Sequence, residues 1–346
     1  MSVAKHIHNA VVLPGAVARG AYEAGVLEVL AASDAKIDRI VATSSGALNG
    51  VAYAAGVRGG DVRAVTAKLS QAWLEQGGWQ DALHLSPMGV LRGVGASSRD
   101  GLLKMLREVV KPCRASVKHA VQLRIVVAPL NGVAAKIGGK AATTYEKAVH
   151  FSGEDFDSQE GLERIFAAAA AACAFPGLFQ PVDLPGLGPC IDGGAVNNAP
   201  LKYALDDGTV GRVYIPVPFP EFLASPFLGT GVHLAIHLVE ILINERLFRD
   251  LRSAQMVNKD VGRIERLARK GIISAEQAAE IMRTLEIRRV AITEIRPERQ
   301  LKGGSFSGFF SKSQRARLVQ EGREAAQRCL NKVEPEADPH EQTLTE

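Results

Sequence analysis

Cysteine is scarce in this sequence, and the few cysteines are scattered along the chain. They are Cys113, Cys173, Cys190 and Cys329. Their spacing matches neither a zinc site nor a redox pair, so we expect no metal. A large chain with few, scattered cysteines is typical of a reducing compartment, and we therefore expect a cytoplasmic protein.

Long apolar segments are also lacking. The most apolar helical region, residues 222–250, contains proline, glycine, histidine and glutamate, which argues against a transmembrane helix. Lys5, His6 and His8 lead into a short apolar run rather than into the core of a signal peptide. A buried helix is the leading interpretation of 222–250, and a membrane-docking lid is the alternative.

Aromatic residues make up only 5% of the chain, so small aliphatic side chains must fill much of the core. The formal net charge of +4 is modest but uneven. Residues 245–270 include eight basic and four acidic side chains, whereas residues 331–346 include one Lys and five acidic side chains. The basic segment could attract anionic lipid, although a solvated helix face is the simpler explanation. No pattern combines aromatic and basic residues, so we expect no nucleic-acid binding.

Apolar periodicity predicts alternating strands and helices. The predicted strands are 9–13, 39–43, 121–130, 134–137, 143–151, 212–217 and 289–295. The predicted helices are 20–32, 45–55, 59–76, 100–110, 159–174, 222–250, 259–270, 275–284 and 311–330. The order strand, helix, strand, helix favours a three-layer α/β/α fold with a mostly parallel central sheet.

We expect one domain over residues 1–330. Its core spans about 9–220, a helical part spans about 222–330, and an acidic, flexible tail follows at 331–346. The segment 173–200 is rich in Gly and Pro, which predicts loops.

Ser44 lies in the pentapeptide from Ala42 to Gly46, between a predicted strand and a predicted helix. The pentapeptide fits the nucleophile elbow G-x-S-x-G, with Ala42 in the first position. Small residues flank the serine of such an elbow because a larger Cβ would collide with the neighbouring strand or helix. A helix N-cap is the alternative role for Ser44, and its place directly after a strand favours the nucleophile.

A serine nucleophile needs an oxyanion site and a base. The turn from Gly15 to Gly20 enters a helix, and its backbone N–H groups could stabilise an oxyanion, although a tight connection that binds nothing is the alternative. None of the eight histidines has an evident triad context. The best acid is Asp192, which precedes Gly193 and Gly194, although a turn aspartate is its alternative role.

Three separated segments resemble the motifs of the patatin-like phospholipases. Gly15-Ala16-Val17-Ala18-Arg19-Gly20 is similar to the family's anion loop, Ala42 to Gly46 to its elbow, and Asp192-Gly193-Gly194 to its D-G-G/A motif. The flanking sequences AYEAGVL, ALNG, AFPGLFQPV and AVNNAPL are similar as well. The order and separation of the motifs fit the family.

The resemblance implies a Ser44–Asp192 dyad in place of a triad, with Ser44 as the nucleophile and Asp192 as the base. It implies that Arg19 orders the anion loop and that neither metal nor cofactor takes part. The substrates it implies are fatty-acyl esters of phospholipids or glycerolipids, which would allow peripheral contact with a membrane.

The chain departs from the family pattern at three positions. Ala16 and Val17 replace two loop glycines, and Ala42 replaces the first elbow glycine. A positive φ at Val17 would cost about 1–2 kcal/mol, and more because valine is β-branched. The sequence therefore leaves two rivals to an acyl hydrolase: an acyltransferase or thioesterase with the same dyad, and a non-catalytic lipid-binding protein.

Overall fold

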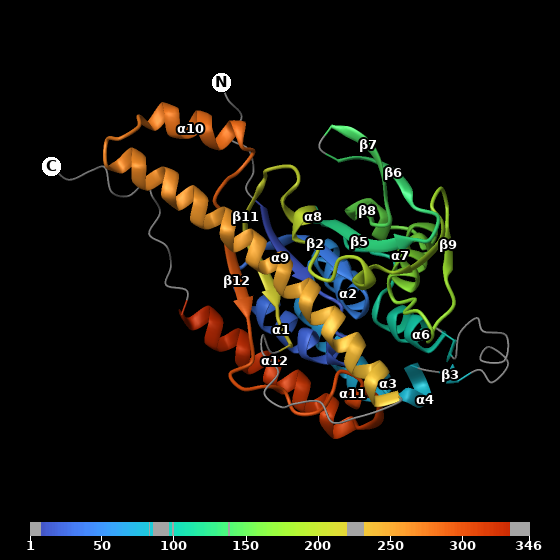
Figure 1. Ribbon diagram of the computed structural model, residues 1–346. Coiled ribbons are helices and arrows are strands. Elements are labelled where there is room, and N and C mark those ends of the chain that lie inside the picture. Colours follow the sequence, from blue (N-terminus) through green and yellow to red (C-terminus); the bar gives the residue numbers. More distant parts are fainter. Residues whose placement is uncertain are drawn as a thin grey trace.

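The computed structural model describes residues 8–82, 84–85, 97–98, 100–137, 139–219 and 232–332. A central sheet runs in the order β12-β11-β1-β2-β5-β10-β9, with helices on its faces (Figure 1). Its strands are β1 (His8–Leu13), β2 (Ile37–Thr43), β5 (Gln122–Pro129), β8 (Lys147–Ser152), β9 (Val182–Leu184), β10 (Gly188–Asp192), β11 (Val210–Pro216) and β12 (Ala291–Ile295). Two separate two-stranded antiparallel sheets pair β3 (His84–Leu85) with β4 (Ser97–Ser98) and β6 (Val133–Ile137) with β7 (Lys140–Thr144).

The helices follow the chain between and after these strands. The α-helices are α1 (Gly20–Ala32), α2 (Ser45–Gly59), α3 (Val62–Gln76), α4 (Trp79–Ala82), α6 (Asp100–Val109), α7 (Gln159–Ala172), α8 (Leu201–Leu205), α9 (Val232–Arg269), α10 (Ala275–Thr284), α11 (Ser307–Phe310) and α12 (Lys312–Lys332). Short 3-10 helices are η1 (Val17–Arg19), η2 (Gly153–Phe156) and η3 (Gly193–Ala195).

Most of the sheet is parallel, as the sequence predicts. Strands β12, β11, β1, β2 and β5 pair in parallel, while β8 and β10 pair antiparallel with β5, and β9 pairs antiparallel with β10. Alternate residues of β1 enter two different cores, as the pleat of a strand requires. Val11 and Leu13 pack with α1, α2 and α12, whereas Ala10 and Val12 pack with α9. The predicted mixed α/β fold is thus confirmed.

Strand register brings the predicted motifs together at one edge of the sheet. Leu13 of β1 pairs with Ala42 of β2, so the loops that follow the two strands begin side by side. Thr43 pairs with Val126 of β5, and the next residue of β5 pairs with Asp192 of β10. The end of β10 therefore arrives next to the turn that follows β2.

Several predicted elements differ in the structure. The segment 173–200, predicted as loop, contains the strands β9 and β10. Strand β10 forms because it pairs with β5, and β9 because it pairs with β10, and the Gly- and Pro-rich sequence of the segment does not predict this pairing. The predicted strand 143–151 is divided into the end of β7 and the separate strand β8. Residues 307–310, which no predicted helix or strand includes, form the short helix α11.

The predicted helices 222–250 and 259–270 are joined in α9, a single helix of 38 residues. Its residues 251–258 contain neither Gly nor Pro, and Leu247, Leu251 and Val261 are buried along one side. A continuous buried stripe of this kind favours one long helix. The predicted residues 222–231 and the tail after Lys332 lie outside the described residues.

Candidate active site

Ser44 lies at the turn between β2 and α2 with a strained backbone. Its φ is +51° and its ψ is −137°, a combination that a residue other than glycine adopts only at a cost. Ser44 occupies the N-cap position of α2, yet its side chain makes no capping hydrogen bond. Instead its Oγ donates a hydrogen bond of 2.6 Å to Oδ2 of Asp192. The side chain therefore points away from the helix and toward the carboxylate.

Asp192 ends β10 and is almost fully buried, with 2% of its surface exposed. Its Oδ1 accepts a hydrogen bond of 2.8 Å from the backbone N–H of Gly194. Burial raises the pKa of Asp192 to about 7, although the hydrogen bonds from Ser44 and Gly194 act in the opposite direction. A carboxyl group with this pKa can take up and release a proton near neutral pH.

Small residues allow the backbone segments of the site to approach closely. Ala42 is buried close to the end of β2. A Cβ at Gly46 would lie 2.4 Å from the carbonyl oxygen of Leu13, and a Cβ at Gly193 would lie 2.2 Å from that of Val126. Both distances are far shorter than a nonbonded contact allows, so a side chain at Gly46 would push α2 away from the end of β1, and one at Gly193 would push η3 away from β5.

The predicted anion loop reaches the site mainly through Val17. Val17 has a φ of +53°, so this β-branched residue adopts the strained conformation that the sequence analysis considered. The backbone N–H groups of Gly15 and Ala16 donate to Asn198 Oδ1 (2.9 Å) and Ser45 Oγ (3.0 Å). The N–H of Val17 has no acceptor within the described part of the chain.

Two polar residues that the sequence reasoning missed hold this loop. Asn198 is fully buried, and its Nδ2 donates to the carbonyl oxygens of Gly15 (3.1 Å) and Ile243 (3.3 Å). Ser45, directly after the nucleophile candidate, accepts the N–H of Ala16. The sequence AVNNAPL, which includes Asn198 and is similar to the family, could have marked this residue as a candidate. The contact between Asn198 and Gly15 could not be predicted, because 183 residues separate the two in the chain.

Arg19 holds the predicted anion loop in place through contacts outside the two cavities. Its guanidinium donates to the carbonyl oxygens of Pro218 (3.0 Å) and Gly303 (2.8 Å) and lies 5.0 Å from the ring centre of Phe219. Burial lowers the pKa of Arg19. Gly20 follows as the first residue of α1. Arg19 thus ties η1 to two distant segments and takes no place in either cavity beside Ser44.

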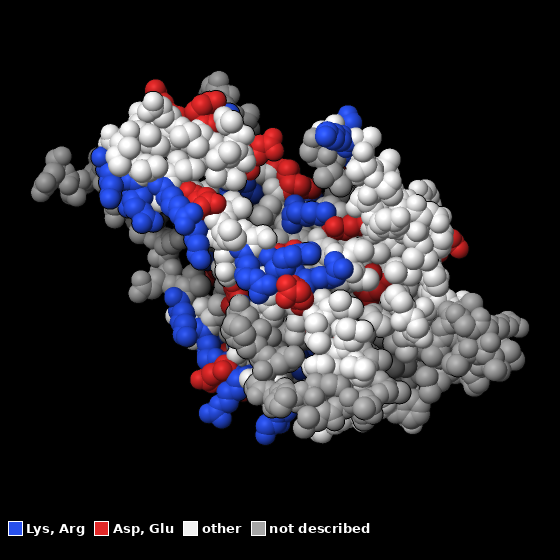
Figure 2. Space-filling view, in the orientation of Figure 1, with Lys and Arg blue, Asp and Glu red and all other residues white. Residues whose placement is uncertain are grey.

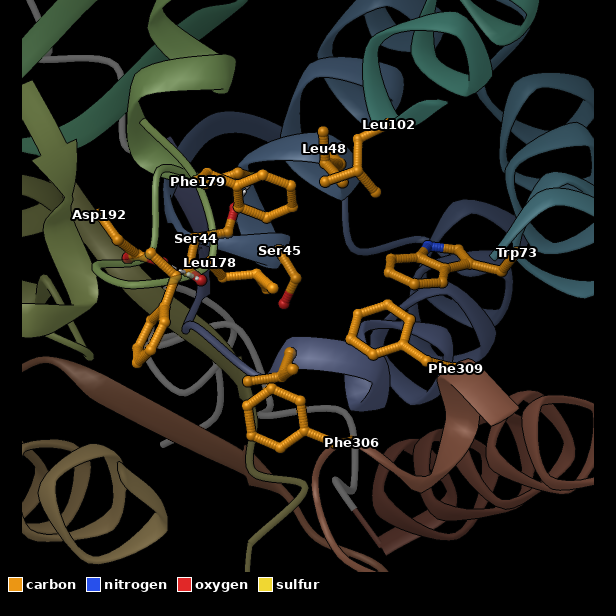
Figure 3. A pocket seen from close by; sticks show the side chains of 13 residues that line it. Ser44, Ser45, Leu48, Trp73, Leu102, Leu178, Phe179, Asp192, Phe306 and Phe309 are labelled. Atoms are coloured by element: carbon orange, nitrogen blue, oxygen red, sulfur yellow. Dashed lines mark hydrogen bonds between the residues drawn. The ribbon is translucent and has the colours of Figure 1, made fainter. Parts of the chain in front are cut away.

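Two cavities meet at Ser44, Val17 and Asp192. The first is narrow and largely apolar, and Figure 3 shows Trp73, Phe309, Phe306 and Phe179 around its centre. The second has a volume of about 250 Å³ and is bordered by Asn198, Leu242, Ile243 and Arg246. No histidine lines either cavity among the described residues, and these residues contain no cluster of side chains suited to a metal ion.

An α/β fold with a serine at a strained strand-to-helix turn is typical of hydrolases that act on acyl esters. Comparison with known families agrees, because the model of the patatin-like phospholipases matches residues 11–205, more than half of the 346 residues. The chain belongs to the patatin-like phospholipase family. Membership supports lipid acyl hydrolase activity in general.

The chain is also distantly similar to solved structures. The crystal structure of VipD from Legionella pneumophila shares 13% sequence identity with it, at a TM-score of 0.39, over 95% of this chain and 67% of VipD. No curated protein matches the chain in sequence. Among the described helices, none is both long and apolar enough to span a bilayer.

Proposed function

We propose that this protein hydrolyses acyl esters of lipids through a dyad of Ser44 and Asp192. The observation that carries the proposal is the 2.6 Å hydrogen bond from Ser44 Oγ to Asp192 Oδ2, made from a strained turn between β2 and α2. A serine hydroxyl is a weak nucleophile until a neighbouring base accepts its proton. Asp192 is the one acidic side chain among the described residues that line the two cavities.

The reaction proceeds in two halves. Ser44 Oγ bonds to the ester carbonyl carbon while Asp192 accepts the hydroxyl proton, and the carbonyl oxygen becomes an oxyanion. Collapse of this intermediate breaks the ester bond, and Asp192 returns the proton to the leaving alcohol. Water then attacks the acyl carbon on Ser44 and loses a proton to Asp192. When this second intermediate collapses, the bond to Ser44 Oγ breaks, Asp192 returns the proton to that oxygen, and the fatty acid leaves. A pKa of about 7 suits a group that must act as base and acid in turn.

The oxyanion is stabilised by the backbone N–H of Val17, aided by the positive end of α2. The N–H groups of Gly15 and Ala16, by contrast, serve Asn198 and Ser45 and hold the loop in place. A donor that carries no other hydrogen bond is preorganised for the transition state, because nothing must be broken when the charge develops.

The two cavities divide the substrate. The acyl chain enters the apolar cavity near Trp73 and Phe309, where burial of its methylene groups is favourable. The alcohol part lies in the second cavity beside Arg246, whose Nη1 donates to the carbonyl oxygen of Val196 (2.7 Å). A guanidinium held in this way favours an anionic group such as the phosphate of a phospholipid. We propose action in the cytoplasm, because few, scattered cysteines are typical of a reducing compartment.

Covalent labelling is the direct test. A fluorophosphonate should label the protein on Ser44, and a mass spectrum of the labelled peptide should place the adduct there. Ser44→Ala and Asp192→Asn should lose hydrolysis of a short acyl ester by about 10³-fold or more. Ser253→Ala, an exposed serine on α9, is the matched control and should label and turn over normally.

Three results would count against the proposed function, and two of them would favour one of its rivals. Normal turnover by Ser44→Ala would exclude the dyad. A folded protein that neither reacts with the fluorophosphonate nor hydrolyses any ester would favour a non-catalytic lipid-binding protein. Acyl transfer to an added alcohol in preference to water would identify a transferase that uses the same dyad.

A further inference from the structure

The outward face of α9 has an unusual distribution of side chains. Leu234, Leu238, Ile241 and Leu242 are 52%, 54%, 42% and 52% exposed, although each is a large aliphatic residue. Their spacing of four, three and one residues places them on one side of the helix. The opposite side is different, since Ile243 and Leu247 are buried in the core. We name Leu234, Leu238, Ile241 and Leu242 the apolar stripe.

The same face becomes basic farther along the helix. Five basic residues of α9 are exposed, and each follows the previous one by three, four or seven residues. They are Arg249, Arg252, Lys259, Arg263 and Arg266. Residues 245–270 carry eight basic and four acidic side chains, a net charge of +4. Figure 2 shows Lys and Arg side chains along α9 with acidic side chains among them, and Arg249, Arg252 and Arg263 form ion pairs with Asp250, Glu245 and Asp260, so the basic residues are in excess rather than alone. We name these five residues the basic stripe.

The apolar stripe adjoins the entrance to the candidate active site. Leu242 belongs to the stripe and also lines the cavity that contains Ser44 and Arg246. A lipid held by the stripe would therefore reach the cavity without crossing water. A helix of 38 residues extends about 57 Å, so its two stripes together can lie along a surface much larger than a single ligand.

We propose that the outward face of α9 docks on the surface of an anionic lipid bilayer. The apolar stripe enters the boundary between headgroups and acyl chains, and the basic stripe lies over anionic headgroups. A bilayer satisfies both halves of this face, whereas a second copy of the chain would have to place like charges against each other. This proposal goes beyond the proposed function. It rests on that function only for the reason why docking is useful, which is to deliver lipid to the cavity that contains Ser44.

Vesicle binding tests the proposal directly. The full chain should sediment with vesicles of phosphatidylcholine and phosphatidylglycerol and bind vesicles of phosphatidylcholine alone much more weakly. The double variant Leu234→Glu, Leu238→Glu should reduce the partition coefficient about tenfold or more, because two aliphatic side chains no longer enter the lipid. Val117→Glu changes an aliphatic residue that is 67% exposed outside α9, and this control should bind like the unmodified protein.

A second pair of variants tests the basic stripe. Arg249→Gln with Arg252→Gln should reduce binding to the anionic vesicles about fivefold for each charge removed and should weaken its dependence on salt. Arg164→Gln removes an exposed arginine from α7 and should have no such effect. Circular dichroism should show that every variant keeps its helices.

Several outcomes would overturn the proposal. Equal binding to neutral and anionic vesicles would remove the role of the basic stripe, and unchanged binding by Leu234→Glu, Leu238→Glu would remove that of the apolar stripe. A dimer in analytical ultracentrifugation that the same double variant dissociates would show that a second copy covers this face. Vesicle binding without hydrolysis of any soluble ester would leave docking intact and count against the dyad, so the two proposals fail separately.

Discussion

Val17 and Ser44 are two non-glycine residues with positive φ, +53° and +51°, and both border the two cavities of the candidate site. Each comes from a different strand-to-helix turn, after β1 and after β2, at the edge where Leu13 pairs with Ala42. The two strained residues therefore lie next to each other at the site where the Ser44 hydroxyl donates a hydrogen bond to the Asp192 carboxyl group. Strain of this kind persists only when the surrounding contacts enforce it.

The positive φ of Val17 makes a prediction about stability. At such a position glycine is favoured over alanine by about 1 kcal/mol, the reverse of the order at most sites. We therefore expect Val17→Gly to have a higher free energy of unfolding than Val17→Ala in urea titrations. The contrary order would mean that Val17 does not hold this conformation in solution. Both variants keep the backbone N–H, so neither should lose turnover completely.

The pKa of Asp192 predicts how activity depends on pH. Because burial raises this pKa to about 7, the carboxylate that accepts the Ser44 proton forms only as the pH rises through about 7. A plot of kcat/KM against pH for a soluble short-chain ester should rise with a single ionisation in that range. An inflection near the ordinary range of aspartate, about pH 4, would show that Asp192 is not buried as described.

The raised pKa of Asp192 also affects stability, and here the expected pH dependence is the reverse of that of activity. Between about pH 4 and pH 7 the unfolded chain has lost the Asp192 proton while the folded chain retains it, so the folded state binds more protons. The free energy of unfolding should therefore fall as the pH rises through this window. Asp192→Asn cannot ionise, so its free energy of unfolding relative to the unmodified protein should increase across the same window.

Asn198 is expected to act as a positioning residue for the anion loop. Its amide accepts a hydrogen bond from the N–H of Gly15 and donates one to the carbonyl oxygen of Gly15. Asn258 makes the same pair of hydrogen bonds with the backbone of Val290. Asn198→Ala and Asn258→Ala should each lower the free energy of unfolding by about 1–3 kcal/mol. Only Asn198→Ala should lower kcat, by about 10²-fold, because the Val17 N–H then loses its fixed position. Equal kcat for the two variants would reduce Asn198 to a structural role.

Arg246 is expected to select substrates with a negative charge close to the ester. Arg246→Gln should lower the ratio of kcat/KM for a phospholipid to kcat/KM for a neutral diacylglycerol by about tenfold or more. Arg246→Lys should recover part of the ratio. Arg249→Gln removes the same charge one turn away, outside the cavity, and should leave the ratio unchanged when both substrates are presented in detergent micelles. A ratio that Arg246→Gln does not alter would separate this guanidinium from substrate recognition.

Local motifs made the fold class and the central residues predictable. The alternation of apolar strands and amphipathic helices predicts a parallel sheet, because each strand must be followed by a crossover that covers the sheet. Ser44 and Asp192 stand in short sequence patterns whose geometry is local, a strand-to-helix turn and an acid before two glycines. By contrast, β10 and the unbroken α9 depend on partners far along the chain, and the sequence analysis missed both.

The sequence by itself determined the α/β architecture, the elbow around Ser44 and the candidate acid Asp192, because each follows from neighbouring residues. Only the tertiary structure decided that Asn198 holds Gly15, that Val17 keeps a backbone donor without a partner in the described chain, and that Arg246 borders the cavity. These relationships join segments up to 183 residues apart. They arise from strand register and from burial against the sheet, which no local pattern encodes.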